Sequence, residues 1–303
     1  MKTLVSILLA ARPKTLPAGI VPVWLGAMIV WRFQSHYPEI GFRLDVHLAL
    51  LTLASVLCLQ VACNFFNDAI DCAKKADTAE RQGPQRMTAS GRLSPAAVSS
   101  TGAAFLVLAC AAAWPLIELR GWPMLAIGLP SLYFAYGYTG GPWPLAYRGL
   151  GEAFVILFFG IIAVAGTVFV QIGWHPNYLD IYTVALMIGV QCGMLSSVLI
   201  EVNNIRDRKE DERTGKCTLA VRLGNARARG LAMAFVAAAY LTLPQVGRLL
   251  PGLALNVYWL PLLLLAGFLI LKINKTPADK RMNKVLGLAA LHLILFAFTL
   301  TFA

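Results

Sequence analysis

The chain has 303 residues, of which 58% are hydrophobic and only 14% are charged. A soluble globular domain carries roughly 25% charged residues, so this composition excludes that class and favours a protein that spans a membrane. The formal net charge of +11 would suit a nucleic-acid-binding protein, but the positions of the charges favour another explanation.

Apolar segments of about the length that crosses a bilayer recur along the whole chain. They predict an all-α, polytopic membrane protein. A short interfacial helix precedes the first span, because Arg12 and Lys14 follow the apolar residues 4–11 without a signal-peptide cleavage site. The nine predicted transmembrane helices are Thr15–Trp31, Val46–Phe66, Pro95–Ile117, Pro123–Tyr138, Ala153–Ile172, Ile181–Ile200, Gly230–Val246, Gly252–Leu271 and Val285–Phe302.

The basic residues fall on one side of this topology. All but four of the 26 Lys and Arg residues lie before the first span or in the loops after the second, fourth, sixth and eighth spans. By the positive-inside rule, the N-terminus and these loops face the cytoplasm and the C-terminus lies across the membrane. We therefore expect an integral protein of a bacterial cytoplasmic (inner) membrane, surrounded by lipid, with no nucleic-acid partner.

Two acid-rich motifs emerge from apolar helices on the predicted cytoplasmic side. Asn67 and Asp71 are four residues apart, as are Asn203, Asp207 and Asp211, so each set lines one face of a helix. Carboxylates at the mouth of a membrane helix suit Mg²⁺, which takes one or two of them and fills its other positions with water and substrate phosphate oxygens. The motifs therefore predict metal binding.

Basic residues lie beside both acid sets. Acids that hold a metal and bases that hold phosphate oxygens together predict a diphosphate site. Charged loops that merely cap helices are the alternative for either cluster alone, and the shared Asn-then-Asp spacing favours the functional interpretation. The basic residues are Lys74, Lys75, Arg81 and Arg86 at the first motif, and Arg206, Arg208, Arg213, Lys216 and Arg222 at the second.

Two more segments at the same predicted membrane face each have two interpretations. Arg12 and Lys14 are either interfacial anchors or diphosphate contacts. The Gly-, Pro- and aromatic-rich segment Tyr138–Glu152 is either part of an interfacial aromatic belt or the wall of a pocket for an aromatic acceptor. Ser94 and Pro95 are predicted to begin the third span as N-cap and first residue.

With these residues the chain resembles the UbiA superfamily of intramembrane prenyltransferases over nearly its whole length. The resemblance implies one domain over residues 1–303, folded as an all-α bundle around a central cavity, in which Mg²⁺ bridges carboxylates to a polyprenyl diphosphate. Each motif follows an even-numbered span, which suggests a pseudo-repeat of spans one to four and five to eight. Matched by position are Asn67, Asp68, Asp71 and Asp77 in the first motif, and Asn203, Asn204, Asp207 and Asp211 in the second.

The spacing within the first motif distinguishes branches of the superfamily. The 4-hydroxybenzoate branch has its last Asp eight residues after the Asn, where this chain has Lys75. Asp77 instead follows Asn67 by ten residues, which resembles the 1,4-dihydroxy-2-naphthoate polyprenyltransferases of menaquinone synthesis. Met87–Gly91 departs from that branch and is closer to the hydroxybenzoate and chlorophyll branches, so another aromatic acceptor stays open. Four further segments resemble the naphthoate branch: Arg12–Pro17, Arg81–Arg86, Tyr147–Gly151 and Gly215–Gly224.

The resemblance also implies roles for the site residues. An allylic diphosphate ionises when metal ions and fixed cations neutralise its leaving group, and the allylic cation then alkylates an aromatic carbon away from water. The expected cofactor is Mg²⁺, and the substrates are a polyprenyl diphosphate and an aromatic acceptor. Asp77 and Glu152 are candidates for deprotonating that acceptor. The expected catalytic metal ligands are Asp68, Asp71 and Asp77 for one ion and Asp207 and Asp211 for the other; the diphosphate residues are Asn67, Arg81, Arg86, Asn203, Lys216 and Arg222.

Two functions from other classes fit less well. A CDP-alcohol phosphotransferase also sets Asp pairs at a membrane face, but its Asp-Gly-x-x-Ala-Arg element is missing from this sequence. A cation transporter would carry its acids near the middle of the bilayer, whereas these acids cluster toward one face.

Overall fold

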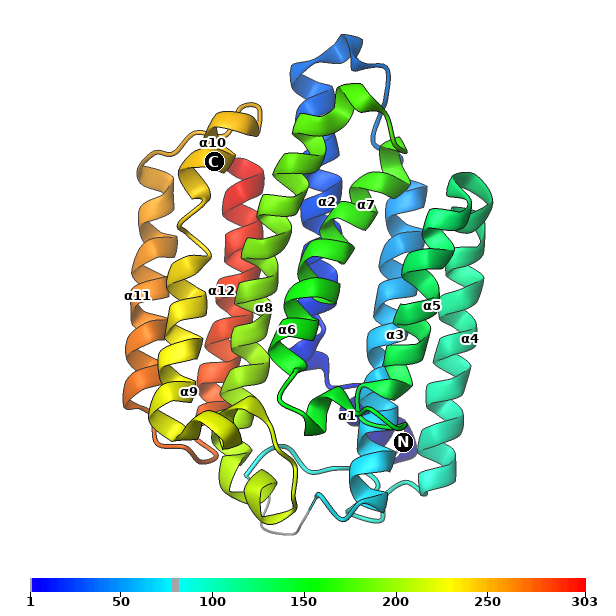
Figure 1. Cartoon of the computed structure of the whole chain (residues 1–303), viewed down its shortest axis with the longest axis vertical. Coiled ribbons are helices and arrows are strands. Elements are labelled where there is room, and N and C mark those ends of the chain that lie inside the picture. Colours follow the sequence, from blue (N-terminus) through cyan, green and yellow to red (C-terminus); the bar gives the residue numbers. More distant parts are fainter. Residues whose placement is uncertain (1, 78–81) are drawn as a thin grey trace.

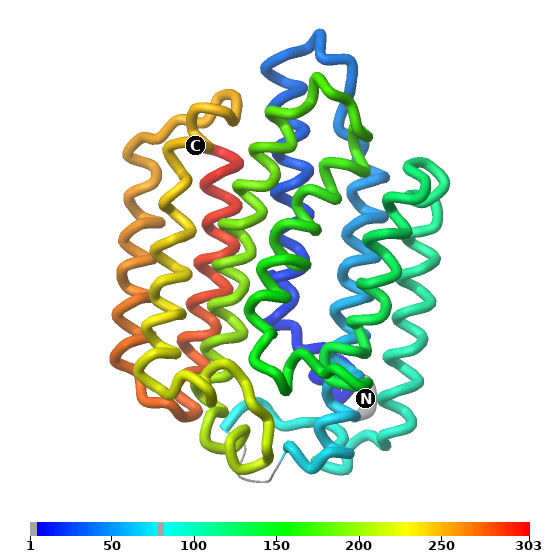
Figure 2. The backbone as a smooth tube through the Cα atoms, in the orientation of Figure 1, coloured from blue at the N-terminus to red at the C-terminus, as the bar shows by residue number. Residues whose placement is uncertain are grey.

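The computed structural model describes residues 2–77 and 82–303. Within these ranges the regular structure is entirely helical, and the long helices run side by side in one bundle (Figures 1 and 2). This confirms the predicted all-α polytopic architecture. The α-helices are α1 (Lys2–Ala10), α2 (Pro17–His36), α3 (Val46–Ala73), α4 (Pro95–Arg120), α5 (Trp122–Gly137), α6 (Gly151–Val155), α7 (Ala163–Ile172), α8 (Leu179–Arg213), α9 (Leu219–Ala238), α10 (Leu243–Leu249), α11 (Leu260–Lys275) and α12 (Met282–Phe302).

The predicted count of nine spans is too high. In the described part of the chain, seven helices are long and apolar enough to cross a membrane, or eight if the pair Val5–Thr15 and Pro17–His36, bent by 55°, forms one span. The fourth predicted span corresponds to α5, whose 16 residues are too few to cross a bilayer unaided. The eighth begins at Leu260 instead of Gly252, because Pro251 and the positive φ of Gly252 (69°) interrupt the helix.

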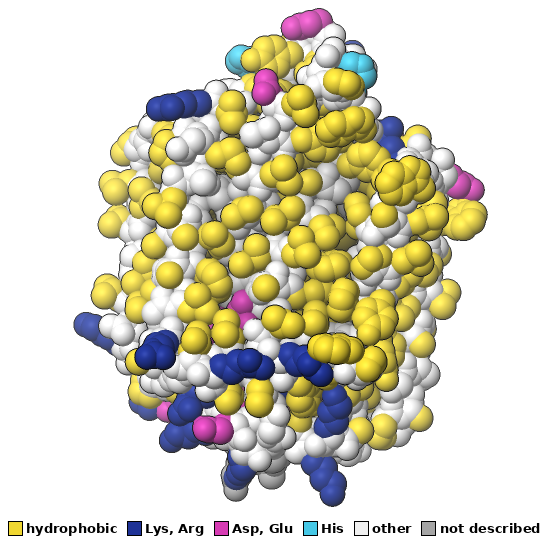
Figure 3. All heavy atoms as spheres, viewed as in Figure 1, with side chains coloured by type: hydrophobic (Ala, Val, Ile, Leu, Met, Phe, Trp, Pro, Cys, Tyr) yellow, Lys and Arg dark blue, Asp and Glu magenta, His cyan; other side chains and the backbone are white. Residues whose placement is uncertain are grey.

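Both acidic motifs lie at the same end of the bundle. The first occupies the last turns of α3 and the residues beyond it, and the second occupies the last turns of α8. The short helix α1 lies at this end too, and the C-terminus lies at the opposite end (Figure 1). On the face shown in Figure 3, most Lys and Arg side chains form a band at the motif end, below a broad apolar surface. This is the one-sided charge distribution on which the predicted topology depends.

The predicted start of α4 is confirmed. The Ser94 hydroxyl accepts a hydrogen bond from the Ala97 amide at 3.2 Å, and Pro95 is the first helical residue. The cap satisfies one of the amides that a helix N-terminus leaves without an intrahelical partner. The Ser94 cap therefore fixes the point at which the loop containing Arg86 ends and α4 begins.

A π-helical turn, η4 (Ile156–Ile162), joins α6 to α7 and lies directly against α8. A Cβ atom on Gly160 would be 2.3 Å from the Gly189 carbonyl oxygen and 2.6 Å from the Gly193 Cα. The two backbones therefore touch, as small residues allow in membrane helices. This contact fixes the start of α6, which contributes to the site, against the motif helix α8.

Candidate active site

A cavity of about 400 Å³ lies between the two motif helices. Its walls come from the loop before α2, from α3, from the loop containing Arg86, from the start of α6 and from α8. Its volume is typical of small-molecule sites, and its walls combine charged and apolar side chains. The predicted site residues that line it are Asn67, Asp68, Arg86, Asn203, Asp207, Asp211 and Lys216.

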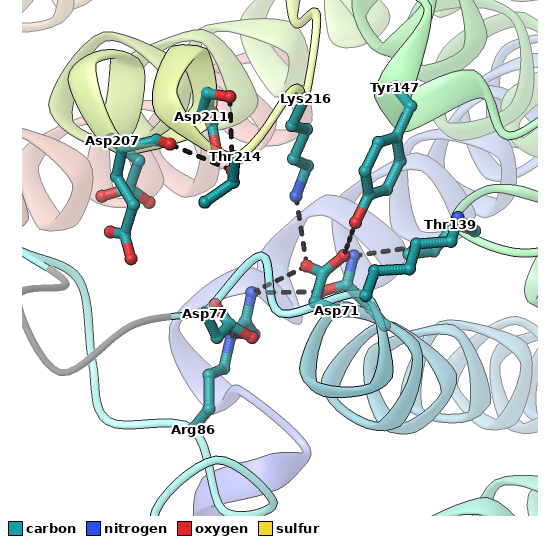
Figure 4. A network of polar contacts seen from close by, with 12 residues as sticks. Asp71, Asp77, Arg86, Thr139, Tyr147, Asp207, Asp211, Thr214 and Lys216 are labelled. Carbon is teal, nitrogen blue, oxygen red and sulfur yellow. Dashed lines mark hydrogen bonds and ion pairs between the residues drawn. The ribbon is translucent and has the colours of Figure 1, made fainter.

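Asp71 is at the centre of the polar network at this cavity, and its side chain is fully buried. Its carboxylate accepts hydrogen bonds from the Tyr147 hydroxyl at 2.8 Å and from the Lys216 ammonium at 3.1 Å (Figure 4). The Arg86 guanidinium lies 3.8 Å from the same carboxylate. Burial, and then the Asp71 charge, raise the pKa of Tyr147 well above its ordinary value, so this hydroxyl stays protonated and remains a donor.

Asn67 links three segments at the other side of this network. Its side-chain oxygen accepts hydrogen bonds from Arg12 and from Arg86, the latter at 3.0 Å, and its amide nitrogen donates to the Thr139 hydroxyl at 3.0 Å. Arg12 has a φ of 54°, a left-handed conformation that is costly for a residue with a Cβ. Arg12 and Lys14 both line the cavity, which favours the site interpretation of this segment over simple membrane anchoring.

Asp68 holds the loop that carries Arg86. Its two carboxylate oxygens accept the backbone amides of Met87 and Thr88, each at 3.0 Å. Arg86 then reaches back to Asp77, with 3.3 Å between Nε and Oδ2. Each Asp68 oxygen keeps a second lone pair, so its role as a metal ligand stays a prediction beside this observed structural role.

The second motif is tied to the C-terminal helix. Asp207 forms a two-pronged ion pair with Arg206, with both N–O distances 2.7 Å, and Arg206 also donates to the Asn283 side chain at 2.6 Å. The backbone carbonyl of Asp211 accepts the Lys216 amide at 2.8 Å. This turn brings Lys216 from the end of α8 back to Asp71.

Not every predicted residue lines the cavity. Asp71 and Asp77 are not part of its wall, although they contact Arg86 and Lys216, which are. Arg81 lies outside the described residues. Arg222 is exposed, donates from Nε to the Cys217 carbonyl at 3.4 Å and is not part of the cavity wall. The assignment of both to diphosphate binding stays a prediction.

Tyr147 and Asn283 take part in these contacts but were not predicted as site residues, and Arg206 was predicted only as one of the bases beside the second motif. Tyr147 and Arg206 lie within segments that the sequence had already marked, one for its aromatic residues and one for its charge. Asn283 has no such signal, because α12 carries no acidic motif.

The aromatic-rich segment Tyr138–Glu152 has features of both predicted interpretations. Tyr138 and Glu152 line the cavity, as a pocket wall requires. Trp143 is 63% exposed and Arg148 stacks on its ring at 4.0 Å, as in an interfacial belt. The segment thus has an inner face toward the site and an exposed outer face.

The oxygen donors fit Mg²⁺. In residues 2–77 and 82–303, no three His, Cys, Asp or Glu side chains gather as in a metal site built from protein alone. Mg²⁺ does not need such a cage, since one or two carboxylates per ion suffice when substrate phosphates and water supply the rest. Asp68 on one wall of the cavity, and Asp207, Asp211 and Asn203 on another, carry oxygen atoms of this kind, and their assignment as ligands stays a prediction.

A second, apolar cavity of about 370 Å³ adjoins the first. The two share four wall residues: Gln60, Cys63, Phe154 and Phe159. The second cavity continues between α3, α4, α5 and α7, and nearly all of its wall is apolar. A charged compartment at the end of the bundle thus leads into an apolar one within it.

Comparisons with known proteins agree with this geometry. The UbiA prenyltransferase family matches residues 19–294. The chain is 35% identical over 237 residues to the 1,4-dihydroxy-2-naphthoate octaprenyltransferase of Mycobacterium tuberculosis, covering 76% of this chain and 73% of that protein. It is 34% identical over 243 residues to the Bacillus subtilis protein of the same name, covering 80% and 73%.

Solved structures show the same fold at low sequence identity. A UbiA homolog from Archaeoglobus fulgidus, bound to GPP and Mg²⁺, is 16% identical with a TM-score of 0.63, covering 98% of this chain and all of that one. The apo UbiA homolog from Aeropyrum pernix, also 16% identical, has a TM-score of 0.64 and covers 95% and 99%. The chain belongs to the UbiA prenyltransferase family and is an integral membrane aromatic prenyltransferase.

Proposed function

We propose that this protein transfers a polyprenyl group from polyprenyl diphosphate to 1,4-dihydroxy-2-naphthoate, with loss of the ring carboxylate, in a Mg²⁺-dependent step of menaquinone synthesis. The observation that carries this proposal is the meeting of both acidic motifs and their cations around one cavity that leads into an apolar compartment. A diphosphate with a long hydrocarbon chain has these two chemical parts.

The diphosphate binds at the motif end of the cavity. Arg12, Arg86 and Lys216 line it with basic groups that donate to phosphate oxygens. Asp207 and Asp211, with Asp68, Asp71 and Asp77 of the first motif, would hold Mg²⁺, and bound Mg²⁺ would neutralise charge on the departing diphosphate. Asn67 and Asn203 orient ligands from the two walls.

The prenyl chain extends from there into the apolar cavity. Phe154 and Phe159 lie at the junction of the two cavities, and the surrounding helices exclude water from the carbon that ionises. Exclusion of water matters because water would otherwise capture the allylic cation before the aromatic ring does.

Three observations support the naphthoate acceptor. Asp77 stands ten residues after Asn67, as in the naphthoate branch. The relatives at 34–35% identity carry the name 1,4-dihydroxy-2-naphthoate octaprenyltransferase. The segment Met87–Gly91, which departs from that branch, does not line the cavity; its amides at Met87 and Thr88 hold Asp68 instead. The departure therefore lies away from the surface that would contact the acceptor.

We further propose that the protein spans the inner membrane of a bacterial cell and that the motif end of the bundle faces the cytoplasm. The support is the concentration of Lys and Arg at that end. Reaction of a membrane-impermeant thiol reagent with exposed Cys217 in intact and in opened cells tests this orientation. Labelling only in opened cells is the expected result, and equal labelling in intact cells would reverse the topology.

An acceptor panel tests the function. Purified protein, Mg²⁺ and a labelled polyprenyl diphosphate are incubated with 1,4-dihydroxy-2-naphthoate, 4-hydroxybenzoate and a porphyrin-type acceptor, and products are identified by mass. We expect the naphthoate to be the preferred substrate, EDTA to abolish turnover and Mg²⁺ to restore it. Clear preference for 4-hydroxybenzoate would overturn the acceptor assignment while leaving the prenyltransferase in place.

A further inference from the structure

The ring of Tyr147 lies against two lysine side chains at the motif end of the bundle. Tyr147 is the last residue of the short 3-10 helix η3 (Leu145–Tyr147), between α5 and α6. The Lys74 ammonium lies 4.1 Å from the centroid of its ring, and the Lys216 ammonium lies 5.3 Å from it. Both lie within about 6 Å, the range over which a cation is attracted to the negative face of an aromatic ring. Since the Tyr147 hydroxyl donates to Asp71, this one side chain contacts both members of the ion pair between Lys216 and Asp71.

The two lysines at this ring differ in what else they contact. Lys74 donates to the backbone carbonyl of Thr139 at 2.8 Å and is not part of the cavity wall. Lys216 lines the cavity and donates to the Asp71 carboxylate at 3.1 Å. Of the two ammonium groups at the ring, that of Lys216 is therefore the one that a ligand in the cavity can meet.

Asp71 accepts Tyr147 and Lys216 on different oxygens. The Tyr147 hydroxyl donates to Oδ1 at 2.8 Å, whereas the Lys216 ammonium donates to Oδ2 (Figure 4). A diphosphate in the cavity would compete with Asp71 for this ammonium, because it carries more negative charge than one carboxylate. The ring offers Lys216 a second partner, which carries no charge and does not compete with the ligand.

The segment of Tyr147 also packs against the segment of Lys216 at a second point. Gly149 has a φ of 64°, and a Cβ atom there would lie 3.0 Å from Nε of Arg222. Arg222 donates to the backbone carbonyl of Cys217, the residue after Lys216, at 3.4 Å. This close packing holds the two segments together, so the position of the ring beside the ammonium does not depend on the attraction between ring and cation alone.

We propose that Tyr147 is a positioning residue for the prenyl donor, whose ring keeps the Lys216 ammonium at the cavity when the diphosphate takes it from Asp71; this rests on the proposed function. In the free protein Asp71 holds the ammonium with or without the ring. Once the ammonium leaves that carboxylate, the ring holds it in place. The ring thus stabilises the bound state more than the free state, and so raises the affinity for diphosphate. Tyr147 is not part of the cavity wall, so it acts through Lys216 and not on the substrate.

A double-mutant cycle with inorganic pyrophosphate and Mg²⁺ as the probe tests this role. Pyrophosphate affinity of the purified full chain is measured by calorimetry, and KM for the prenyl diphosphate is measured beside it. Tyr147→Leu should weaken both by about 5- to 30-fold, the scale of a desolvated contact between a cation and a ring. Tyr147→Phe keeps the ring and should bind about 5-fold or more tightly than Tyr147→Leu. In a Lys216→Met protein, Tyr147→Leu should cause no further loss, because the ammonium on which the ring acts is gone.

Two controls separate this role from other effects of the substitution. Tyr147→Leu should keep its full effect in a Lys74→Met protein, because Lys74 contacts the same ring but does not line the cavity. Tyr258→Leu makes the same change at a tyrosine that is 71% exposed before α11, and it should bind pyrophosphate as the wild type does. If Tyr147→Leu does not fold, phenylalanine analogues with increasing fluorine content at position 147 keep the ring but weaken its negative face, and affinity should fall with each added fluorine.

The failures are distinguishable. A wild-type protein that transfers no prenyl group from a polyprenyl diphosphate to any aromatic acceptor would contradict the proposed function itself. An active wild type, together with a Tyr147→Leu variant of unchanged pyrophosphate affinity and unchanged KM, would overturn only the role of Tyr147. A loss that is equally large in the Lys216→Met protein, or an affinity that does not respond to fluorination, would also overturn it, because the ring would then act by some route other than the Lys216 ammonium.

Discussion

The Lys216 ammonium lies 3.1 Å from the Asp71 carboxylate, and this ion pair joins the two acidic motifs across 145 residues of sequence. We predicted different partners for the two groups: a metal ion for Asp71 and a diphosphate for Lys216. In the structure they neutralise one another inside the protein. Binding of substrate and metal would therefore exchange partners, with each charge passing to a new opposite charge instead of being left buried and alone.

Removing a motif carboxylate should abolish activity without removing the protein from the membrane. We expect Asp71→Asn and Asp207→Asn each to lower turnover by ~100-fold or more, since a loss of several kcal/mol of charge stabilisation costs a factor of ten per ~1.4 kcal/mol. Turnover and membrane content are measured in the same preparations. Near-normal activity in either variant would contradict the assignment of these acids as metal ligands.

The cations at the cavity should act on the donor substrate. Lys216→Ala and Arg86→Ala should raise KM for prenyl diphosphate or lower kcat, with little change in KM for the acceptor, because each removes a donor to phosphate oxygens. Arg92→Ala is the matched control: Arg92 lies in the same loop as Arg86, but it is exposed and does not line the cavity. Equal effects of the Arg86 and Arg92 substitutions would favour a role of these charges in membrane topology alone.

Asp68 should show an effect on stability as well as on activity. The two Asp68 oxygens accept hydrogen bonds from the Met87 and Thr88 backbone amides, and Asp68→Asn would place its side-chain NH2 group against one of these donors. Losing that hydrogen bond to a charged group should lower the free energy of unfolding by about 1.5–3 kcal/mol. We expect a lower melting temperature in detergent together with reduced activity. An Asp68→Asn protein as stable as the wild type, but inactive, would make Asp68 a metal ligand rather than a support for the Arg86 loop.

The backbone contact between η4 and α8 should tolerate no side chain. Gly160→Ala would place a Cβ 2.3 Å from a carbonyl oxygen of α8, and a backbone atom cannot turn aside as a side chain can. We expect a loss of at least about 1–3 kcal/mol, the cost of overpacking, and poor accumulation in the membrane. Gly287→Ala, where a Cβ meets nothing within 4 Å, is the control and should accumulate normally.

Periodic features of the sequence predicted much of the fold. Apolar length located the long helices, and four-residue spacing placed Asn67 with Asp71, and Asn203 with Asp207, on helices whose ends lie together. The count of spans was wrong because apolar length alone does not show where a helix stops. α5 has only 16 residues, and α2 counts as a span only together with the bent segment before it.

Contacts within the site were less accessible to prediction, because they join positions far apart in the chain. Residue type and spacing indicated that Asp68 would face a ligand, but not that two backbone amides would occupy its oxygens. The opposite case is Arg222. It lies in a segment that resembles the family motif, yet its side chain does not line the cavity.

The most direct test of the proposed reaction is the fate of the acceptor's carboxylate. 1,4-Dihydroxy-2-naphthoate carrying an isotopic label in its carboxyl group is incubated with the purified protein, Mg²⁺ and a polyprenyl diphosphate, and released carbon dioxide is compared with prenylated product. We predict one carbon dioxide for each product molecule and no release when the prenyl diphosphate is omitted. A prenylated product that retains the labelled carboxylate would contradict the assignment of this protein to 1,4-dihydroxy-2-naphthoate.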